Sequence, residues 1–472
     1  MWRGARVFRA AVVSALVAFT AAVPAAHGGG PAGGGPPLTL RPCAVQGTSA
    51  RCGTLVVPEN RAKPSGRKIG LRVVVVPALI QPAAEDAVTY LAGGPGSAAT
   101  AAAGGLSAQL SGLNLHHDLL LVDQRGTGKS SPYSCPNPKA PLTSKARLRS
   151  YTLTCLKAFG GDMRQYGTRM AADDLDAVRA ALGYRQLNVV GGSYGATAAQ
   201  VYMKLHPDSV RTLTLVVPSA LDVPILGRWA VNAQRALHQW ARLCDAQPAC
   251  QKAFPGWERQ FAALVKAWDA RPARVRKGVT MTGVQLASVV HSMLLDAGKA
   301  TSIPLLVARA AKGDYRPLGR AGSGDLGFSP QLMYWSIWCS EPWTGLDARG
   351  PWGTAFDSYA AAFIAEFRRG CTFMPKRAEP RTLWTFPSST RVPALAIVGG
   401  ADPQDPIANL PDLERNFPDS RAVILPRTGH AVDLGGCVDK LLSTFVARAT
   451  TKGLNTTLCN SQSSEPVFEL DG

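Results

Sequence analysis

A serine flanked by glycines is the residue of this sequence best suited to nucleophilic chemistry. Residues 187–196 read Leu-Asn-Val-Val-Gly-Gly-Ser-Tyr-Gly-Ala, an apolar run that leads into Gly191-x-Ser193-x-Gly195 and a helix-forming stretch. This pattern is typical of a sharp turn between a strand and a helix that exposes the serine hydroxyl. Glycine is needed on both sides because a Cβ atom there would collide with the adjoining strand or helix. The amide of Tyr194 would be free to donate to an oxyanion.

A nucleophilic serine of this kind needs a histidine base, and the order along the chain is serine, acid, histidine. Of the seven histidines, only His430 lies in the last third of the chain, in a loop after a short apolar run. The acid is expected after the apolar residues 394–398, which are followed by Gly-Gly-Ala and then Asp402. Asp405 competes for this role, but Asp402 stands nearer to the end of the predicted strand. The sequence therefore predicts a catalytic triad of Ser193, Asp402 and His430.

Two more glycine-rich turns follow predicted strands. Residues 88–96 read Val-Thr-Tyr-Leu-Ala-Gly-Gly-Pro-Gly and predict a loop that supplies a second oxyanion donor, from Gly94 in preference to Gly93. Residues 118–130 contain another short apolar run, which is followed by Asp-Gln-Arg-Gly-Thr-Gly-Lys-Ser. The last part of this segment imitates a phosphate-binding loop, but that motif needs glycine where Asp123 stands. We therefore expect no nucleotide site there.

Together these segments resemble the proline iminopeptidase family, and within it the secreted branch similar to tripeptidyl aminopeptidases. The shared motifs are a Gly-Gly-Pro-Gly loop, an Asp-Gln-Arg-Gly turn, the serine elbow, an Asp-Pro-x-x-Pro acid loop (here residues 402–406) and a Gly-His base loop. The resemblance covers about residues 50–460 and implies an α/β-hydrolase fold, with a mainly parallel sheet and a large helical cap insertion. Ala92 stands where many intracellular members have histidine. This difference favours the secreted branch over the intracellular enzymes that release a single proline.

Residues 1–26 have the pattern of a secretory signal peptide. Three arginines precede an uncharged stretch, and small residues surround a cleavage position near Ala25 or Ala26. The alternative is an uncleaved membrane anchor, although the apolar part is short for a span. Residues 27–40 are rich in glycine and proline and predict a flexible leader. We expect a secreted or extracytoplasmic protein without a transmembrane segment after signal cleavage.

Ten cysteines in an exported chain favour disulfides. The sequence does not fix their connectivity, but neighbouring positions suggest Cys43 with Cys52, Cys135 with Cys155, Cys244 with Cys250, Cys339 with Cys371, and Cys437 with Cys459. A metal site is disfavoured because the sequence has no Cys-x-x-Cys motif and no histidine near a cysteine pair at ligand spacing. We expect neither a metal nor an organic cofactor.

The formal net charge is +19 at pH 7, including the arginines of the signal segment. A basic surface is attracted to anionic polymers, so a loose association with an anionic cell envelope is the partner that charge suggests. However, the basic residues are spread along the chain without a dense run, and no nucleic-acid motif is present. We therefore do not expect nucleic acid as a partner.

The pattern of strands and helices divides the mature chain into three parts. Residues 41–221 alternate predicted strands and helices, such as a strand at 71–76 and an amphipathic helix at 172–182, and form the first part of the core. Residues 222–388 are predicted to be mainly helical and form the cap. Residues 389–472 form the second part of the core, with the strands that precede the acid and the base.

Nine tryptophans lie within residues 229–384, in the predicted cap. They would either line an apolar pocket over Ser193 or, for the most part, form the helical core. Glu341, between Trp338 and Trp343, is the candidate anion for the free ammonium of an aminopeptidase substrate. The rival interpretation places Glu341 on the solvated surface.

These observations predict a secreted serine exopeptidase that releases amino-terminal residues or short peptides through an acyl-enzyme. Two alternatives stay open. A carboxylic ester hydrolase would use the same triad and oxyanion hole, so small esters are expected substrates beside peptides. An inactive envelope-binding protein is the second alternative, and the intact triad argues against it.

Overall fold

The computed structural model describes residues 38–138, 142, 144–316, 318, 331–386, 390–460 and 465–470. The predicted signal peptide and most of the predicted leader lie outside these residues. The described residues belong to one compact unit, and nine of their strands build one sheet with the order β1-β2-β3-β5-β4-β6-β7-β10-β11. Its strands are β1 Arg41–Val45, β2 Thr48–Pro58, β3 Lys68–Val76, β4 Ala87–Leu91, β5 Leu119–Val122, β6 Leu187–Gly192, β7 Val210–Val216, β10 Ala394–Gly399 and β11 Ser420–Leu425.

The sheet is antiparallel at one edge and parallel over the rest. Strands β1, β2, β3 and β5 pair antiparallel in turn, whereas β5, β4, β6, β7, β10 and β11 are all parallel. The carboxyl ends of the parallel strands therefore meet at one edge of the sheet. Side chains that follow β6, β10 and β11 are brought together there, although they are far apart in sequence.

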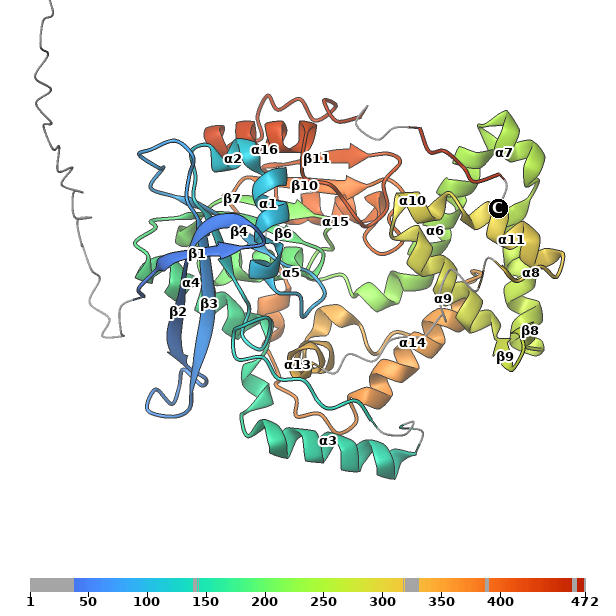
Figure 1. Cartoon of the computed structure of the whole chain (residues 1–472), viewed down its shortest axis with the longest axis horizontal. Helices are drawn as coiled ribbons and strands as arrows, with labels where there is room; N and C mark the ends of the chain where they lie inside the picture. Colours follow the sequence, from blue (N-terminus) through green and yellow to red (C-terminus); the bar gives the residue numbers. More distant parts are fainter. Residues whose placement is uncertain are drawn as a thin grey trace, which may run out of the picture. The chain divides into compact units, whose positions relative to one another are not determined.

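Helices cover both faces of the sheet (Figure 1). Alternate residues of β3 show why: Val73 and Val75 join one hydrophobic cluster, while Val74 and Val76 join another on the opposite face. The first cluster includes residues of α4 and α5, and the second includes residues of α1, α2 and α16. These helices are α1 Ala103–Gln109, α2 Ser111–Asn114, α4 Thr168–Ala181, α5 Tyr194–Leu205 and α16 Cys437–Arg448.

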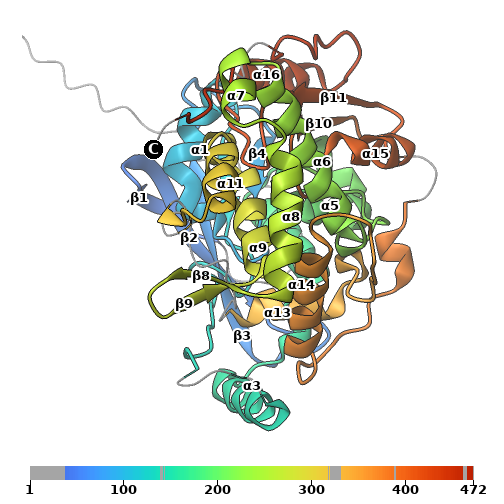
Figure 2. The same ribbon diagram turned by 90° about the vertical axis from the view of Figure 1, so that its right-hand side faces the viewer.

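A long insertion separates β7 from β10 and consists mainly of helices, with a short hairpin of β8 and β9. Helix α8 packs against α9 and α11, and α14 packs against α6 and α9 (Figures 1 and 2). Its elements are α6 Ile225–Asp245, α7 Pro248–Ala253, α8 Trp257–Ala270, β8 Ala273–Arg276, β9 Val279–Met281, α9 Gly283–Leu294, α10 Ala297–Ala300, α11 Ile303–Ala311, α13 Leu332–Ser340 and α14 Asp357–Gly370. The described residues also form the α-helices α3 Lys145–Phe159 and α15 Leu410–Asn416.

The insertion and the sheet share one hydrophobic core. Buried residues of α6, α9 and α14 belong to the same cluster as residues of β6, β7 and α5. All ten cysteines lie in the described part of the chain and form the five disulfides Cys43–Cys52, Cys135–Cys155, Cys244–Cys250, Cys339–Cys371 and Cys437–Cys459. These are the neighbour pairs that the spacing suggested, and none of them links the insertion to the sheet.

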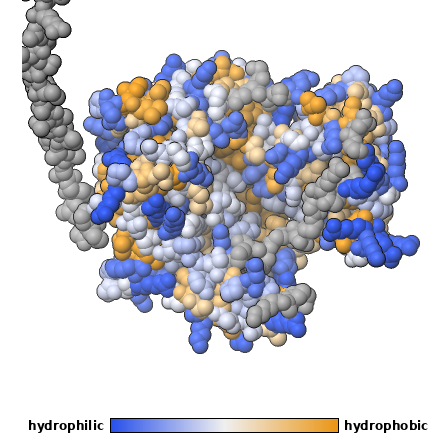
Figure 3. Space-filling view, viewed as in Figure 1, coloured by the Kyte–Doolittle hydropathy of each residue, from blue (hydrophilic) through white to orange (hydrophobic). Residues whose placement is uncertain are grey.

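The surface gives two observations on partners. Among the described residues, no helix combines the length and the apolar character that crossing a membrane requires. On the face drawn in Figure 3, hydrophobic residues lie in separate patches between hydrophilic ones.

Candidate active site

Ser193 lies in a sharp turn between β6 and α5. Its backbone has φ 55° and ψ −125°, a conformation that non-glycine residues seldom adopt and that is typical of strained functional turns. A Cβ atom added to Gly195 would lie 1.9 Å from the carbonyl oxygen of Leu91, and one added to Gly191 would lie 2.2 Å from the oxygen of Gly195. The glycines of the motif are therefore required by backbone packing.

Ser193, His430 and Asp402 form a continuous chain of hydrogen bonds. The Nε2 atom of His430 lies 2.9 Å from the Oγ atom of Ser193, and its Nδ1 atom lies 2.8 Å from Oδ2 of Asp402. The other carboxylate oxygen of Asp402 accepts hydrogen bonds from the backbone amides of Gln404 and Asp405, at 2.8 and 3.1 Å. Asp402 is fully buried. The three predicted residues thus have the geometry of a proton-transfer triad.

The second acid, Asp405, is also close to the histidine. Its Oδ2 atom lies 3.9 Å from Nδ1 of His430, so Asp402 is the nearer partner. Burial alone would lower the pKa of His430, but the charge and hydrogen bond of Asp402, together with the charge of Asp405, raise it to about 9. The side chains of Asp402, Asp405 and His430 are close enough together to surround a metal ion. Both ring nitrogens of His430 already serve hydrogen bonds, so we assign the group to proton transfer.

The predicted oxyanion donors lie around Ser193. Tyr194 is the first residue of α5, so its N–H has no acceptor within the helix. Gly94 and Tyr194 line the same cavity as Ser193. Gly93 is packed against the nucleophile, because a Cβ atom added to it would lie 3.0 Å from the Cβ atom of Ser193. An oxyanion site between these amides agrees with this arrangement.

A cavity of about 270 Å³ opens above Ser193, between the sheet and the insertion. One part of its wall is aromatic, and its rings belong to Trp229, Tyr334, Trp338, Trp343, Tyr359 and Phe363. Another part is polar and is formed by Thr197, Ser219, Ser288, His291, Ser292, Gln404 and Asp405. Other tryptophans, including Trp240 and Trp257, are buried in the core away from the cavity. The insertion thus supplies both core packing and the wall of the cavity.

The surface position predicted for Glu341 is wrong, and its predicted role as an ammonium site finds no support in the structure. Its side chain is neither on the surface nor among the residues that line the Ser193 cavity. Its two carboxylate oxygens accept hydrogen bonds from the amide of Thr168, the hydroxyl of Thr168 and the indole N–H of Trp343, each at 2.7 Å. Burial raises the pKa of Glu341 to about 7 despite these bonds. Both carboxylate oxygens are thus already paired inside the protein, outside the wall of the Ser193 cavity.

Instead, Glu341 is connected to the elbow through Thr168. Because the hydroxyl proton of Thr168 is donated to Glu341, the phenol of Tyr194 donates to the oxygen of Thr168, at 2.8 Å. The phenol oxygen accepts a hydrogen bond from the side-chain amide of Gln124, also at 2.8 Å. The ring of Tyr194 packs 5.9 Å from the ring of Trp343. These contacts fix the side chain of the residue whose amide is the expected oxyanion donor.

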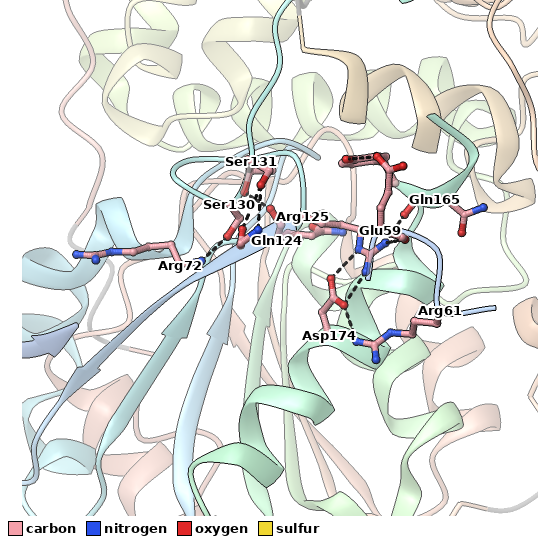
Figure 4. A network of polar contacts seen from close by, with 12 residues as sticks. Glu59, Arg61, Arg72, Gln124, Arg125, Ser130, Ser131, Gln165 and Asp174 are labelled. Carbon is pink, nitrogen blue, oxygen red and sulfur yellow. Dashed lines mark hydrogen bonds and ion pairs between the residues drawn. The ribbon is translucent and has the colours of Figure 1, made fainter. Parts of the chain in front are cut away.

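A buried arginine holds the turn that carries Gln124. Arg125 is fully buried and makes two hydrogen bonds to Asp174, at 2.6 and 2.7 Å, and two more to the carbonyls of Glu59 and Gln165, at 2.8 Å each. In Figure 4, the side chains of Arg125 and Arg61 both point toward Asp174. The Asp-Gln-Arg-Gly motif therefore has a structural explanation, since it joins the end of β5 to α4 and to the turn before it.

Sequence reasoning missed several residues of the cavity. His291 was passed over because it precedes the acid in the chain, yet α9 brings it into the cavity wall. Ser219, in the cavity wall, and Thr168, which lies outside it and contacts Tyr194, carry no motif that would have identified them. Asp405 was recognised only as a rival of Asp402. The one available signal was its position three residues after Asp402, in the same loop.

Residues 87–434 match the model of the alpha/beta hydrolase fold family. A tripeptidyl aminopeptidase of Streptomyces lividans is 32% identical over 212 residues, which cover 38% of this chain and 40% of that protein. The serine protease Hip1 of Mycobacterium tuberculosis is 28% identical over 247 residues, 46% of each chain. A proline iminopeptidase of Xylella fastidiosa is 28% identical over 147 residues, 31% of this chain and 33% of that protein. The matches thus span less than half the length of each relative.

Proposed function

Because the chain belongs to the α/β-hydrolase fold family, we propose that it is a secreted serine exopeptidase that removes amino-terminal residues or short peptides. The observation that carries this proposal is the chain of hydrogen bonds from Ser193 through His430 to Asp402. Ser193, at one end of this chain, lies in the wall of the cavity below the insertion. The names of the three relatives, an aminopeptidase, a serine protease and an iminopeptidase, support peptide bonds as the substrate class.

The reaction follows from the positions of the proton donors and acceptors. Ser193 attacks the scissile carbonyl while His430 accepts its proton at Nε2, and the buried charge of Asp402 stabilises the resulting imidazolium. The amides of Tyr194 and Gly94 hold the oxyanion of the tetrahedral intermediate. His430 then protonates the leaving amine, and an acyl-enzyme remains on Ser193 until water attacks it by the same steps in reverse.

The size of the cavity supports removal from the chain end. At about 270 Å³, it is slightly below the range of roughly 300–1,000 Å³ for small-molecule sites. A cavity of this volume holds a short acyl portion, whereas an internal segment of a polypeptide would need an open groove. The aromatic rings of the insertion would exclude water from the acyl-enzyme and favour apolar side chains.

Export is supported by the pattern of the first 26 residues and by the disulfides. Five disulfides that use all ten cysteines, all within the described part of the chain, are typical of proteins that fold in an oxidising compartment. Without the three arginines of the signal segment, the net charge of +19 becomes +16, which would add a weak attraction to an anionic envelope.

A substrate panel tests the proposal. The purified protein is given a tripeptide anilide with a free amino end, the same anilide acetylated at that end, and a short nitrophenyl ester. We expect cleavage of the free peptide and little cleavage of the acetylated one, because the acetyl group adds atoms that the cavity has little room for. Equal cleavage of both peptides would indicate an endopeptidase, and turnover of the ester alone would indicate an esterase. No turnover and no labelling by a fluorophosphonate would indicate an inactive protein.

A further inference from the structure

The carboxylate of Asp405 occupies a position that the triad does not explain. Asp405 lines the cavity beside Ser219 and is buried. Its Oδ2 atom lies 3.9 Å from Nδ1 of His430, the same nitrogen that Asp402 contacts at 2.8 Å. Two acid side chains of one loop thus flank a single ring nitrogen.

Hydrogen bonds hold the carboxyl group of Asp405 in place, and they come from neutral side chains. The hydroxyl of Ser219 donates to Oδ1 of Asp405, and Asn409 in turn donates to the oxygen of Ser219 at 3.1 Å. Among the described residues, His430 is the only basic group within 4 Å of the Asp405 carboxylate. The guanidinium of Arg228 lies 3.3 Å from Oδ1 of Asn409 and is engaged by Asp412, at 2.7 Å. A buried carboxylate is costly without a cation, so His430 is its natural partner.

The other titratable groups around the cavity stay neutral over the working pH range. Burial lowers the pKa of His291, on α9, to about 3. Burial raises the pKa of Tyr359, on α14, to about 12, and it also raises those of Tyr194 on α5 and Tyr334 on α13. Asp405 and His430 are therefore the groups of the cavity whose charge changes in this range. Burial raises the pKa of Glu341 to about 7, but Glu341 lies behind Trp343 and outside the cavity wall.

We propose that Asp405 is a positioning residue whose negative charge acts together with that of Asp402 on His430. Two carboxylates then stabilise the imidazolium that forms when Ser193 attacks an electrophile and His430 accepts its proton. The proposal rests on the serine nucleophile of the proposed function and does not depend on whether the substrate is a peptide or an ester. It assigns to Asp405 an effect on proton transfer, beyond its contribution to the shape of the cavity.

This arrangement predicts how reactivity depends on pH. His430 must be neutral to accept the proton of Ser193, so the reaction rate rises as the pH rises through the pKa of His430. Burial and the charge of Asp402 raise the pKa of Asp405, while His430 and Ser219 oppose this shift. Once Asp405 is ionised, its charge favours protonated His430 and moves the rise in rate to higher pH. Removal of that charge should move the rise in rate to lower pH and should also lower the rate at the plateau.

The experiment measures the second-order rate of labelling by a neutral fluorophosphonate between pH 5 and 10, a reaction that requires no knowledge of the substrate. The variants are Asp405→Asn, which keeps the shape of the side chain, and Ser219→Ala, which removes the hydrogen bond that favours the ionised carboxyl. Asp412→Asn is the matched control, because it removes an acid outside the cavity wall. Thermal unfolding of each variant checks that the fold is retained.

We expect Asp405→Asn to shift the midpoint of the rise by about one pH unit toward acid, which is the low end for a charge at this distance. Relative to its own plateau, labelling at the acid side should increase up to about tenfold. Ser219→Ala should shift the midpoint in the same direction by less and should add nothing to Asp405→Asn, while Asp412→Asn should leave the midpoint unchanged.

An unchanged midpoint in folded Asp405→Asn, or an equal shift in Asp412→Asn, would overturn the proposal. If Asp405→Asn does not fold, an unchanged midpoint in Ser219→Ala has the same meaning. Failure of the serine nucleophile has a different signature, because the wild-type protein would then not be labelled at any pH. Failure of the peptide specificity alone would leave labelling intact and would show in the substrate panel.

Discussion

The Nε2 atom of His430 lies 2.9 Å from the Oγ atom of Ser193, although 237 residues separate them in the sequence. The bond exists because β6 and β11 end at the same edge of the sheet, where the elbow and the base loop meet. Gly429 is part of this junction, since a Cβ atom there would lie 2.5 Å from the carbonyl oxygen of Leu294 in α9. The insertion therefore contacts the loop that carries the base.

Replacement of the nucleophile should abolish activity without unfolding the protein. Ser193→Ala removes one oxygen atom and keeps the glycines of the elbow, so we expect an unchanged midpoint of thermal unfolding. Turnover should fall by up to about 10⁶, and the double variant Ser193→Ala with His430→Ala should be no worse, because the residues of a triad act as a unit. Activity retained by the single variant would identify a different nucleophile.

The two acids should differ in their effect on turnover. Asp402→Asn should reduce kcat by about 10⁴, because the amide no longer holds the required tautomer of His430. Asp405→Asn should cost far less, since Asp405 lies 3.9 Å from the ring nitrogen and makes no hydrogen bond to it. Steady-state kinetics at the plateau pH of each variant measures both effects. A larger loss in Asp405→Asn would show that Asp405 is the acid of the triad.

Glu341→Gln should impair all substrates alike. The glutamine amide cannot accept every hydrogen bond that Thr168 and Trp343 donate, so we expect a stability loss of about 1–3 kcal/mol and a lower kcat through displacement of Tyr194. Peptides with free and blocked amino ends and small esters should lose the same factor. Glu366→Gln, which removes an acid from the ion pair with Arg369 on α14, should change neither quantity. A loss confined to free-amine substrates would restore Glu341 as an ammonium site.

The buried arginine of the Asp-Gln-Arg-Gly turn should be important for stability. Arg125→Met leaves two carbonyls without their donor and Asp174 with only one cationic partner, so the free energy of unfolding should fall by about 3–5 kcal/mol. Arg164→Met is the control, because the ion pair of Arg164 with Asp162 is exposed and should contribute at most about 1 kcal/mol. Urea unfolding of both variants tests the difference. Equal losses would show that the buried pair has no special role.

The fold and the triad could be predicted because their signals are local. The predicted α/β-hydrolase fold is confirmed by the family match. Each parallel strand is an apolar run followed by a turn residue, and the family order of serine, acid and histidine then selects Asp402 and His430. The first strands and the β8–β9 hairpin gave no comparable signal, since they are partly exposed and carry charged residues.

The wall of the cavity could not be predicted, because it depends on contacts between distant segments. Glu341 pairs with Thr168, which lies 173 residues earlier, and nothing near either residue in the sequence indicates that pairing. The same holds for His291, which enters the cavity only because α9 packs against α14 and the base loop. The flanking tryptophans favoured a ligand site at Glu341, whereas its carboxylate is already hydrogen-bonded to Thr168 and Trp343.

The most direct test of the account is to isolate the acyl-enzyme. The protein is mixed with a tripeptide anilide that has a free amino end, quenched in acid within milliseconds to seconds, digested and analysed by mass spectrometry. The account predicts that the peptide containing Ser193 gains the mass of the acyl portion with its amino end intact, and that Ser193→Ala gains nothing. An adduct on another residue, or hydrolysis of the anilide by wild type with no adduct at any quench time, would contradict it.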